Sequence, residues 1–121
     1  AWQLGQHAPY VPTPVSDGKT LFVLSDRGVL QAVDPYSGKA RWEKKFQGNF
    51  YGSPILLGNR LFCLSRDGEA YVLEVGGEAR VLAVSDLSPG EEVTWVDASP
   101  ALVNDSLYLR VGARLDCYRS R

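Results

Sequence analysis

Few residues in this chain are of types that catalyse reactions. His7 is the only histidine, and a general base, a catalytic triad or a zinc site needs partner residues that the sequence does not place near it. Gly76-Gly77 neither opens a helix nor precedes Lys-Ser or Lys-Thr, as a phosphate-binding loop would. Five acidic residues fall in separate predicted turns without the mark of an acid/base pair: Asp26, Asp67, Asp97, Asp105 and Asp116. We therefore predict no catalytic, cofactor-binding or metal-binding residues, and a protein that is not an enzyme.

The cysteines, the overall charge and the length of the apolar runs argue against a disulfide, a nucleic-acid partner and a membrane span. Cys63 and Cys117 lie far apart inside apolar runs, and we interpret them as two small buried side chains rather than a disulfide. The 121 residues carry a net charge of −1, with no basic stripe for a nucleic acid. No apolar run approaches the ~20 residues that span a bilayer. The sequence starts without an initiator Met or a signal peptide, so we expect a processed product or a piece of a longer protein.

The elements that must position any site are short β-strands. Runs rich in β-branched and aromatic residues are bounded by Gly, Asn or Asp, and no stretch holds helical spacing over three turns. Asp34-Pro35-Tyr36-Ser37-Gly38 predicts a tight turn between two of these strands. Pro35 presets φ for its first corner, Gly38 supplies a positive φ, and the Asp34 carboxylate can bind the turn amides. The sequence predicts an all-β fold.

An internal repeat organises these strands. Thr13-Pro14 recurs 40 residues later as Ser53-Pro54 and again as Ser99-Pro100, 46 residues beyond Pro54. Trp2 and Trp42 each stand twelve residues before their proline. Residues in matching positions of the repeat are expected to be structural: Trp2, Pro14, Asp34, Gly38, Trp42, Pro54, Gly68 and Pro100. A period near 40 residues with several short strands per unit is typical of a propeller blade.

The expected domain covers residues 1–121 and is a partial β-propeller of about three four-stranded antiparallel blades. The units fall at about 1–46, 47–86 and 95–121, with the long connection Leu87 to Thr94 between the last two. Ala1-Trp2-Gln3-Leu4 is expected to be an orphan fourth strand, and the last unit to stop after its third strand. Because propellers usually close with about 4–8 blades, we expect either the C-terminal part of a larger propeller or several copies that associate to complete the circle.

Loops, rather than the packed strands, should carry the function. Aligning the repeats on their prolines places Tyr10 opposite Phe50, and Trp95-Val96-Asp97 opposite Asn49-Phe50-Tyr51. These residues precede the innermost strand of each unit, so we expect them on one face. The candidate partner-binding residues are His7, Tyr10, Phe50, Tyr51, Trp95 and Asp97. Aromatic side chains with polar groups suit protein contacts; the alternative is that they cap the blades as packing.

The stretch from Asp34 to Trp42 resembles the repeat of the pyrroloquinoline-quinone-like propeller family, in which Ser-Pro, Gly turns and Ser/Thr-Gly-Lys-x-x-Trp recur. The resemblance covers nearly the whole chain and is strongest in the first unit. It implies that Trp2 and Trp42 pack between adjacent blades. The quinone-dependent dehydrogenases of this superfamily use a bound cation, an Asp base and often vicinal cysteines, and this sequence has neither adjacent cysteines nor an oxygen cage for Ca²⁺.

The resemblance implies a scaffold that binds a protein partner in the periplasm or outside the cell, as non-catalytic relatives such as the outer-membrane-assembly lipoprotein do. We therefore predict a protein-binding module without cofactor, nucleic acid or membrane span. Two alternatives stay open. The chain is a structural part of a quinoprotein dehydrogenase whose active site lies elsewhere, or it is a partial propeller that self-associates or joins the remaining blades of a parent.

Overall fold

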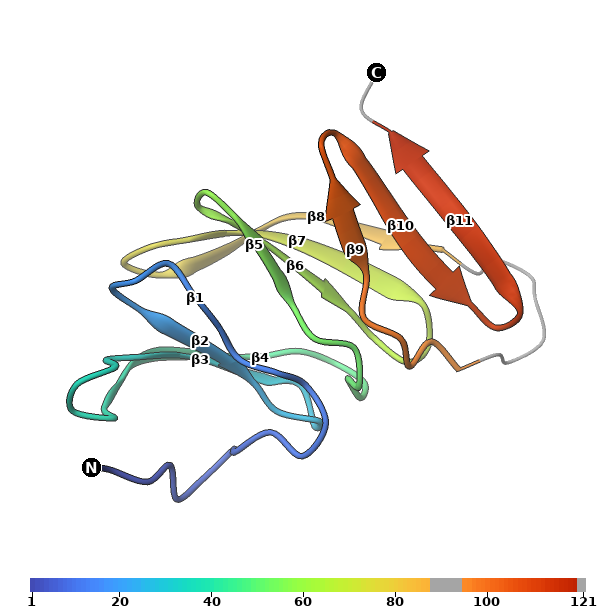
Figure 1. Cartoon of the computed structure of the whole chain (residues 1–121). Helices are drawn as coiled ribbons and strands as arrows, with labels where there is room; N and C mark the ends of the chain where they lie inside the picture. Colours follow the sequence, from blue (N-terminus) through green and yellow to red (C-terminus); the bar gives the residue numbers. More distant parts are fainter. Residues whose placement is uncertain (88–94, 120–121) are drawn as a thin grey trace.

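The computed structural model describes residues 1–87 and 95–119, which form three antiparallel sheets placed side by side (Figure 1). Short apolar runs between Gly, Asn and Asp turns form strands here, as their β-propensity predicts. Within the described residues there is no helix, and so none long and apolar enough to cross a bilayer. The predictions of an all-β fold and of propeller blades are confirmed.

Each sheet is a meander in which sequential strands are neighbours. The first sheet has the order β1-β2-β3-β4, the second β5-β6-β7-β8, and the third, with three strands, β11-β10-β9. The strands are β1 (Val15–Ser16), β2 (Leu21–Leu24), β3 (Val29–Val33), β4 (Ala40–Lys45), β5 (Ile55–Leu57), β6 (Arg60–Leu64), β7 (Glu69–Val75), β8 (Ala79–Asp86), β9 (Ala101–Val103), β10 (Ser106–Val111) and β11 (Arg114–Arg119). The first strand of each sheet starts immediately after the proline of the repeat, at Pro14, Pro54 and Pro100.

Apolar side chains fill the space between neighbouring sheets. All five residues of β3 are buried, as expected for a strand covered on both faces. One cluster joins the first and second sheets, with Phe22, Leu30, Leu61 and Leu73 among its members. A smaller one contains Leu64, Val96, Leu109 and Val111 and joins the second sheet to the third. Packing between blades therefore provides most of the core.

The Ser/Thr-Pro motif also links the blades through hydrogen bonds. The Thr13 amide donates to Ser53 Oγ at 2.8 Å, and the Ser53 amide donates to Ser99 Oγ at 2.9 Å. Gly52 lies beside this link, where an added Cβ would stand 2.9 Å from the carbonyl oxygen of Ala98. The hydroxyl residue before each proline is thus as much a part of the repeat as the proline itself.

The turn after β3 has the predicted construction. Asp34 Oδ1 accepts hydrogen bonds from the amides of Tyr36 and Ser37 at 2.9 and 3.0 Å, while Arg41 Nη2 donates to Oδ2 at 2.8 Å. These bonds favour the charged carboxylate, with the Ser37 amide contributing most, and lower the pKa of Asp34 from 3.8 to about 2. Gly38 has the predicted positive φ, of 73°.

Trp2 and Trp42 make equivalent contacts with successive turns. Trp2 Nε1 donates to Pro35 O, and Trp42 Nε1 donates to Gly76 O, both at 2.9 Å. The Trp2 ring lies so close to Gly38 that an added Cβ would approach it to 2.5 Å. The orphan strand predicted at residues 1–4 is wrong, because these residues form no strand in the structure. A fourth strand pairs with the third strand of its own blade, and β1 is the first strand of this chain.

Two further expectations concern the later units. The long connection between the second and third sheets falls largely on residues 88–94, outside the described residues.

Cys63 is buried, and burial raises the pKa of its thiol to about 12. Cys117 is exposed, contrary to the prediction, because β11 has only β10 beside it and most of its residues reach solvent. Both cysteines are free.

Candidate functional site: an arginine held between two aromatic rings

The meander gives each blade two different ends. One end carries the turns β1–β2 and β3–β4 and their equivalents, and we call it the hairpin rim. The other carries the loops between the second and third strands, at residues 25–28 and 65–68, together with the connections from one sheet to the next. We call this end the connection rim. The predicted partner-binding residues all belong to segments of the connection rim or to the irregular segment before β1.

The connection rim is held together by main-chain hydrogen bonds between consecutive blades. The amide of Phe50 donates to Asp26 O at 2.8 Å, and the amide of Val96 donates to Arg66 O at 2.8 Å. The amide of Arg66 itself donates to Asn49 O at 2.8 Å. Each loop therefore holds the segment that leads into the next blade, and residues in that segment are brought beside the loop.

Arg66 is the centre of the site that results. Its guanidinium carbon lies 4.0 Å from the ring centroid of Tyr51 and 4.6 Å from that of Trp95. Arg66 Nε and Nη2 donate to the two carboxylate oxygens of Asp97 at 2.5 and 3.1 Å. We call these four residues the Arg66 cluster: Tyr51, Arg66, Trp95 and Asp97.

The cluster is held by several contacts yet is partly open to solvent. A guanidinium between two rings gains cation–π attraction, and its bidentate pairing with a carboxylate fixes its plane. The hydrogen bonds to Asp97 also raise the pKa of Arg66 above its ordinary value, so the guanidinium is charged throughout the physiological range. Trp95 remains 52% exposed. The arrangement therefore presents an ordered aromatic and charged surface.

The structure separates the six predicted partner-binding residues into three groups. Tyr51, Trp95 and Asp97 meet in the Arg66 cluster. His7 and Tyr10 are exposed and line a different cavity of about 380 Å³ that also includes Asp26. There, Asp26 Oδ1 accepts hydrogen bonds from the Tyr10 and Val11 amides at 2.7 and 3.2 Å.

Phe50, the sixth residue, cannot contact a partner. Its side chain is fully buried, with its ring centroid 6.1 Å from that of Phe46 and 6.0 Å from that of Tyr71. The hydrogen bond from its amide to Asp26 O holds this part of the chain under the loop of the first blade. For this residue the alternative of packing was the correct interpretation.

Arg66 itself was missed by sequence reasoning. The first blade has Asp26 at the equivalent position, so the repeat gave no reason to expect a cation there. The available signal was the change of charge within an otherwise matching loop, Ser25-Asp26-Arg27-Gly28 against Ser65-Arg66-Asp67-Gly68. Such a change of charge indicates that Arg66 does not have the structural role of Asp26, which accepts hydrogen bonds from main-chain amides.

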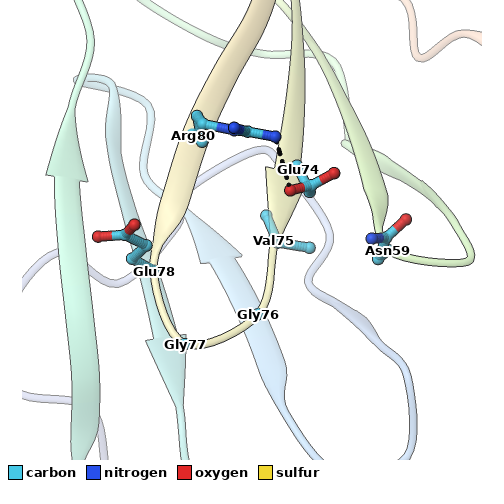
Figure 2. A pocket seen from close by; sticks show the side chains of 7 residues that line it. All are labelled: Asn59, Glu74, Val75, Gly76, Gly77, Glu78 and Arg80. Carbon is cyan, nitrogen blue, oxygen red and sulfur yellow. Dashed lines mark hydrogen bonds and ion pairs between the residues drawn. The ribbon is translucent and has the colours of Figure 1, made fainter.

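Two other hollows lie on the described surface, one on each rim. One, of about 200 Å³, adjoins the Arg66 cluster and is lined by Trp95, Asp97, Ala98, Arg110 and Gly112. The second, of about 590 Å³, lies on the hairpin rim around the turn Gly76–Glu78, where Glu74 pairs with Arg80 at 3.0 Å (Figure 2). Figure 2 shows Glu78 on the opposite side of this hairpin from Asn59. No described aromatic side chain lines the second hollow.

The residues present do not fit a quinone cofactor with a bound cation. Cys63 and Cys117 belong to different sheets, so they cannot form the vicinal pair that the dehydrogenases use. Among residues 1–87 and 95–119, no three His, Cys, Asp or Glu side chains converge as metal ligands. The chemistry that the Arg66 cluster can perform is recognition through stacking, apolar contact and hydrogen bonding.

Comparison with known proteins identifies the family of this chain. Residues 1–110 match the family described as outer membrane protein assembly factor BamB. The chain belongs to the BamB family. No curated protein sequence matches the chain.

Solved structures share the fold of this BamB-family chain at low sequence identity. BamB from Moraxella catarrhalis superposes with a TM-score of 0.70 and 17% identity, over 88% of this chain and 32% of its own. A europium-containing methanol dehydrogenase gives 0.79 and 17%, over 98% and 24%. The quinohemoprotein alcohol dehydrogenase from Comamonas testosteroni gives 0.70 and 15%, over 86% and 17%. This chain thus spans about a third or less of the length of these relatives.

Proposed function

We propose that this chain is a non-catalytic part of a propeller that binds a protein partner through the Arg66 cluster. The observation that carries the proposal is the position of Arg66 between Tyr51 and Trp95, with Asp97 holding its guanidinium. Aromatic and arginine side chains dominate the binding energy of protein interfaces, because they bury much area and lose little rotamer freedom when they are already ordered. His7 and Tyr10 extend the proposed surface at the first blade.

Family membership supports the same function. BamB is named as an assembly factor for outer membrane proteins, a description of a protein that acts on other proteins. We propose a corresponding location outside the cytoplasm, in the periplasm or extracellular space. The dehydrogenases share only the fold with this chain, at identities of 15–17%.

The experiment is site-specific photo-cross-linking. A benzophenone amino acid replaces Trp95 on the connection rim or, as the matched control, Tyr36 on the hairpin rim, which is 89% exposed. The expected result is a cross-linked protein of defined mass from position 95 and none from position 36. The Tyr51→Ala variant should reduce the yield at position 95, since Tyr51 supports one side of Arg66. Equal yields from both positions would contradict the proposal.

The two alternative functions have separate tests. Titration with pyrroloquinoline quinone and Ca²⁺ should produce no change in absorption and no thermal shift; a saturable change would instead support the dehydrogenase alternative. Light scattering should give a molar mass near the 13.3 kDa of one chain. A mass several times larger, unchanged on dilution, would favour self-association as the function of the exposed faces.

A further inference from the structure

The hollow beside the Arg66 cluster contains Arg110, a cation that pairs with no carboxylate of the described residues. We call this hollow the Trp95 cavity; its volume is about 200 Å³, close to that of seven water molecules at about 30 Å³ each. Its walls include an aromatic ring, a small side chain, a glycine and two charged groups: Trp95, Ala98, Gly112, Asp97 and Arg110. The size suits a single side chain of a ligand rather than an extended cofactor.

The two charged groups of the Trp95 cavity differ in how they are satisfied. Both oxygens of Asp97 accept hydrogen bonds from Arg66. Arg110 is exposed, and its Nε donates to Gly112 O at 2.9 Å, which fixes one edge of the guanidinium. No carboxylate of the described residues pairs with it. The N–H groups on its two terminal nitrogens are then the donors that the cavity offers to a ligand.

The aromatic wall adds an apolar requirement. Trp95 is 52% exposed, and its ring is held on one side by the guanidinium of Arg66 at 4.6 Å. Ala98 and Gly112 present little bulk beside it. A ligand that suits these walls has an apolar group to cover the indole and a carboxylate for Arg110, because a planar guanidinium binds carboxylates in a paired geometry.

We infer that the Trp95 cavity receives an aspartate or glutamate side chain, next to an apolar residue, from an extended acidic segment of the protein partner. Arg110 binds the carboxylate and Trp95 packs against the neighbouring apolar side chain. The net charge of −1 offers no broad positive field for a nucleic acid or an anionic membrane. The inference rests on the proposed function and specifies the chemistry of the partner.

The test is an NMR titration of the full chain with two matched peptides. The probe is Ac-Ala-Leu-Glu-Leu-Ala-NH₂, and the control peptide has Gln in place of Glu. The Glu peptide should shift the signals of the Trp95 indole N–H and the Arg110 Nε–H in a saturable manner. The Gln peptide should bind at least tenfold more weakly, because a charge-assisted pair is replaced by neutral hydrogen bonds.

Variants assign the effect to Arg110. The Arg110→Gln variant should lose at least tenfold in affinity for the Glu peptide, and Arg110→Lys should recover only part of it, since lysine keeps the charge but not the paired geometry. The control is Arg80→Gln, an exposed arginine on the hairpin rim, which should bind as the parent chain does. Unchanged binding by Arg110→Gln, or shifts that map elsewhere, would overturn the inference.

Further arms distinguish other ligands and separate this inference from the proposed function. Sodium acetate binding as tightly as the Glu peptide would indicate a site for free carboxylates. Tighter binding of a single-stranded DNA oligonucleotide would indicate a phosphate site. Either result would overturn the inference that an acidic segment binds in the Trp95 cavity. A cross-link from position 95 without selectivity for Glu would leave the proposed function standing and refute the inference. Selective binding of the Glu peptide without a cross-link from position 95 would support the inference and refute the proposed function.

Discussion

Loops 25–28 and 65–68 occupy the same place in consecutive blades and are built alike. In the first, the Ser25 amide donates to Val29 O and Ser25 Oγ accepts from the Val29 amide, at 2.9 and 3.1 Å. In the second, Ser65 and Glu69 make the same pair of bonds at the same two distances. The two loops therefore share the same pattern of hydrogen bonds.

The side chains at their second position are opposites. Asp26 uses its carboxylate on the amides of Tyr10 and Val11, which is a structural task. Arg66 lies between Tyr51 and Trp95, whose rings come from the segments leading into the second and third blades. The comparison teaches that the frame of the blade depends on peptide groups and on a few invariant side chains, whereas the chemistry of the rim changes from one copy to the next.

The largest test of this comparison concerns two aligned aromatic residues. Phe50→Ala should destabilise the chain by about 3–5 kcal/mol, because the removed ring leaves a cavity among Phe46, Tyr71 and their neighbours. Tyr10→Ala, at a side chain that is 89% exposed, should change the free energy of unfolding by less than about 0.5 kcal/mol. Urea unfolding followed by tryptophan fluorescence measures both. Similar effects of the two substitutions would show that they occupy equivalent environments.

A second test uses glycines with similar positive φ angles. Gly18 and Gly28 have φ of 91° and 86°, but a Cβ on Gly18 would meet nothing within 4 Å, while one on Gly28 would lie 2.8 Å from Phe46 O. Gly18→Ala should lower the free energy of unfolding by about 1 kcal/mol through backbone strain alone. Gly28→Ala should lower it by about 3 kcal/mol, because the added Cβ also clashes with Phe46 O. Gly68, with φ of 88°, should respond as Gly28 does if the loops are equivalent. Thermal unfolding of the three variants decides this.

A smaller effect is expected from the buried serines of the two loops. Ser25→Ala and Ser65→Ala each leave an amide without its hydroxyl acceptor, at positions only 5% and 1% exposed. Each should lower the free energy of unfolding by about 1–2 kcal/mol. Ser37→Ala, at an exposed turn, is the control and should be nearly neutral. A large difference between the two loop variants would break the comparison.

The smallest effect comes from pH and concerns the hairpin rim. Because the pKa of Asp34 is about 2 in the folded chain and 3.8 ordinarily, its carboxylate contributes stability that is present above pH 4. This contribution is lost as the pH falls from 3.8 toward 2. Urea unfolding at several pH values should show a shallower decline for Asp34→Asn than for the parent chain. Parallel curves for the two proteins would contradict the assignment.

Much of the frame was predictable from local rules. The turn at Asp34 was found because Pro35, Gly38 and the carboxylate each have a geometric task within a few residues. The repeat of Ser/Thr-Pro located the first strand of each blade. These features depend on sequence neighbours, so the sequence alone contains them.

The residues of the site were harder to predict from the sequence, because the site depends on contacts between blades. The aromatic residues before β5 were treated alike, but a main-chain bond to Asp26 O places Phe50 in the core, whereas Tyr51 meets Arg66. Burial of Phe50 depends on Asp26 in the preceding blade and on Tyr71 in the following one, and both lie outside a local sequence window. Similarly, Trp2 could be matched to Trp42 by register, although residues 1–4 form no strand in the structure.

Ser53 connects two blades through two different groups. Its hydroxyl accepts a hydrogen bond from the Thr13 amide, and its own amide donates to the hydroxyl of Ser99. A unit that donates on one side and accepts on the other can be joined to further copies in only one direction, and repeating such a contact produces a closed circle or an open spiral according to the rotation between units. Both links in this chain therefore point the same way, from an amide of the earlier blade to a hydroxyl of the later one.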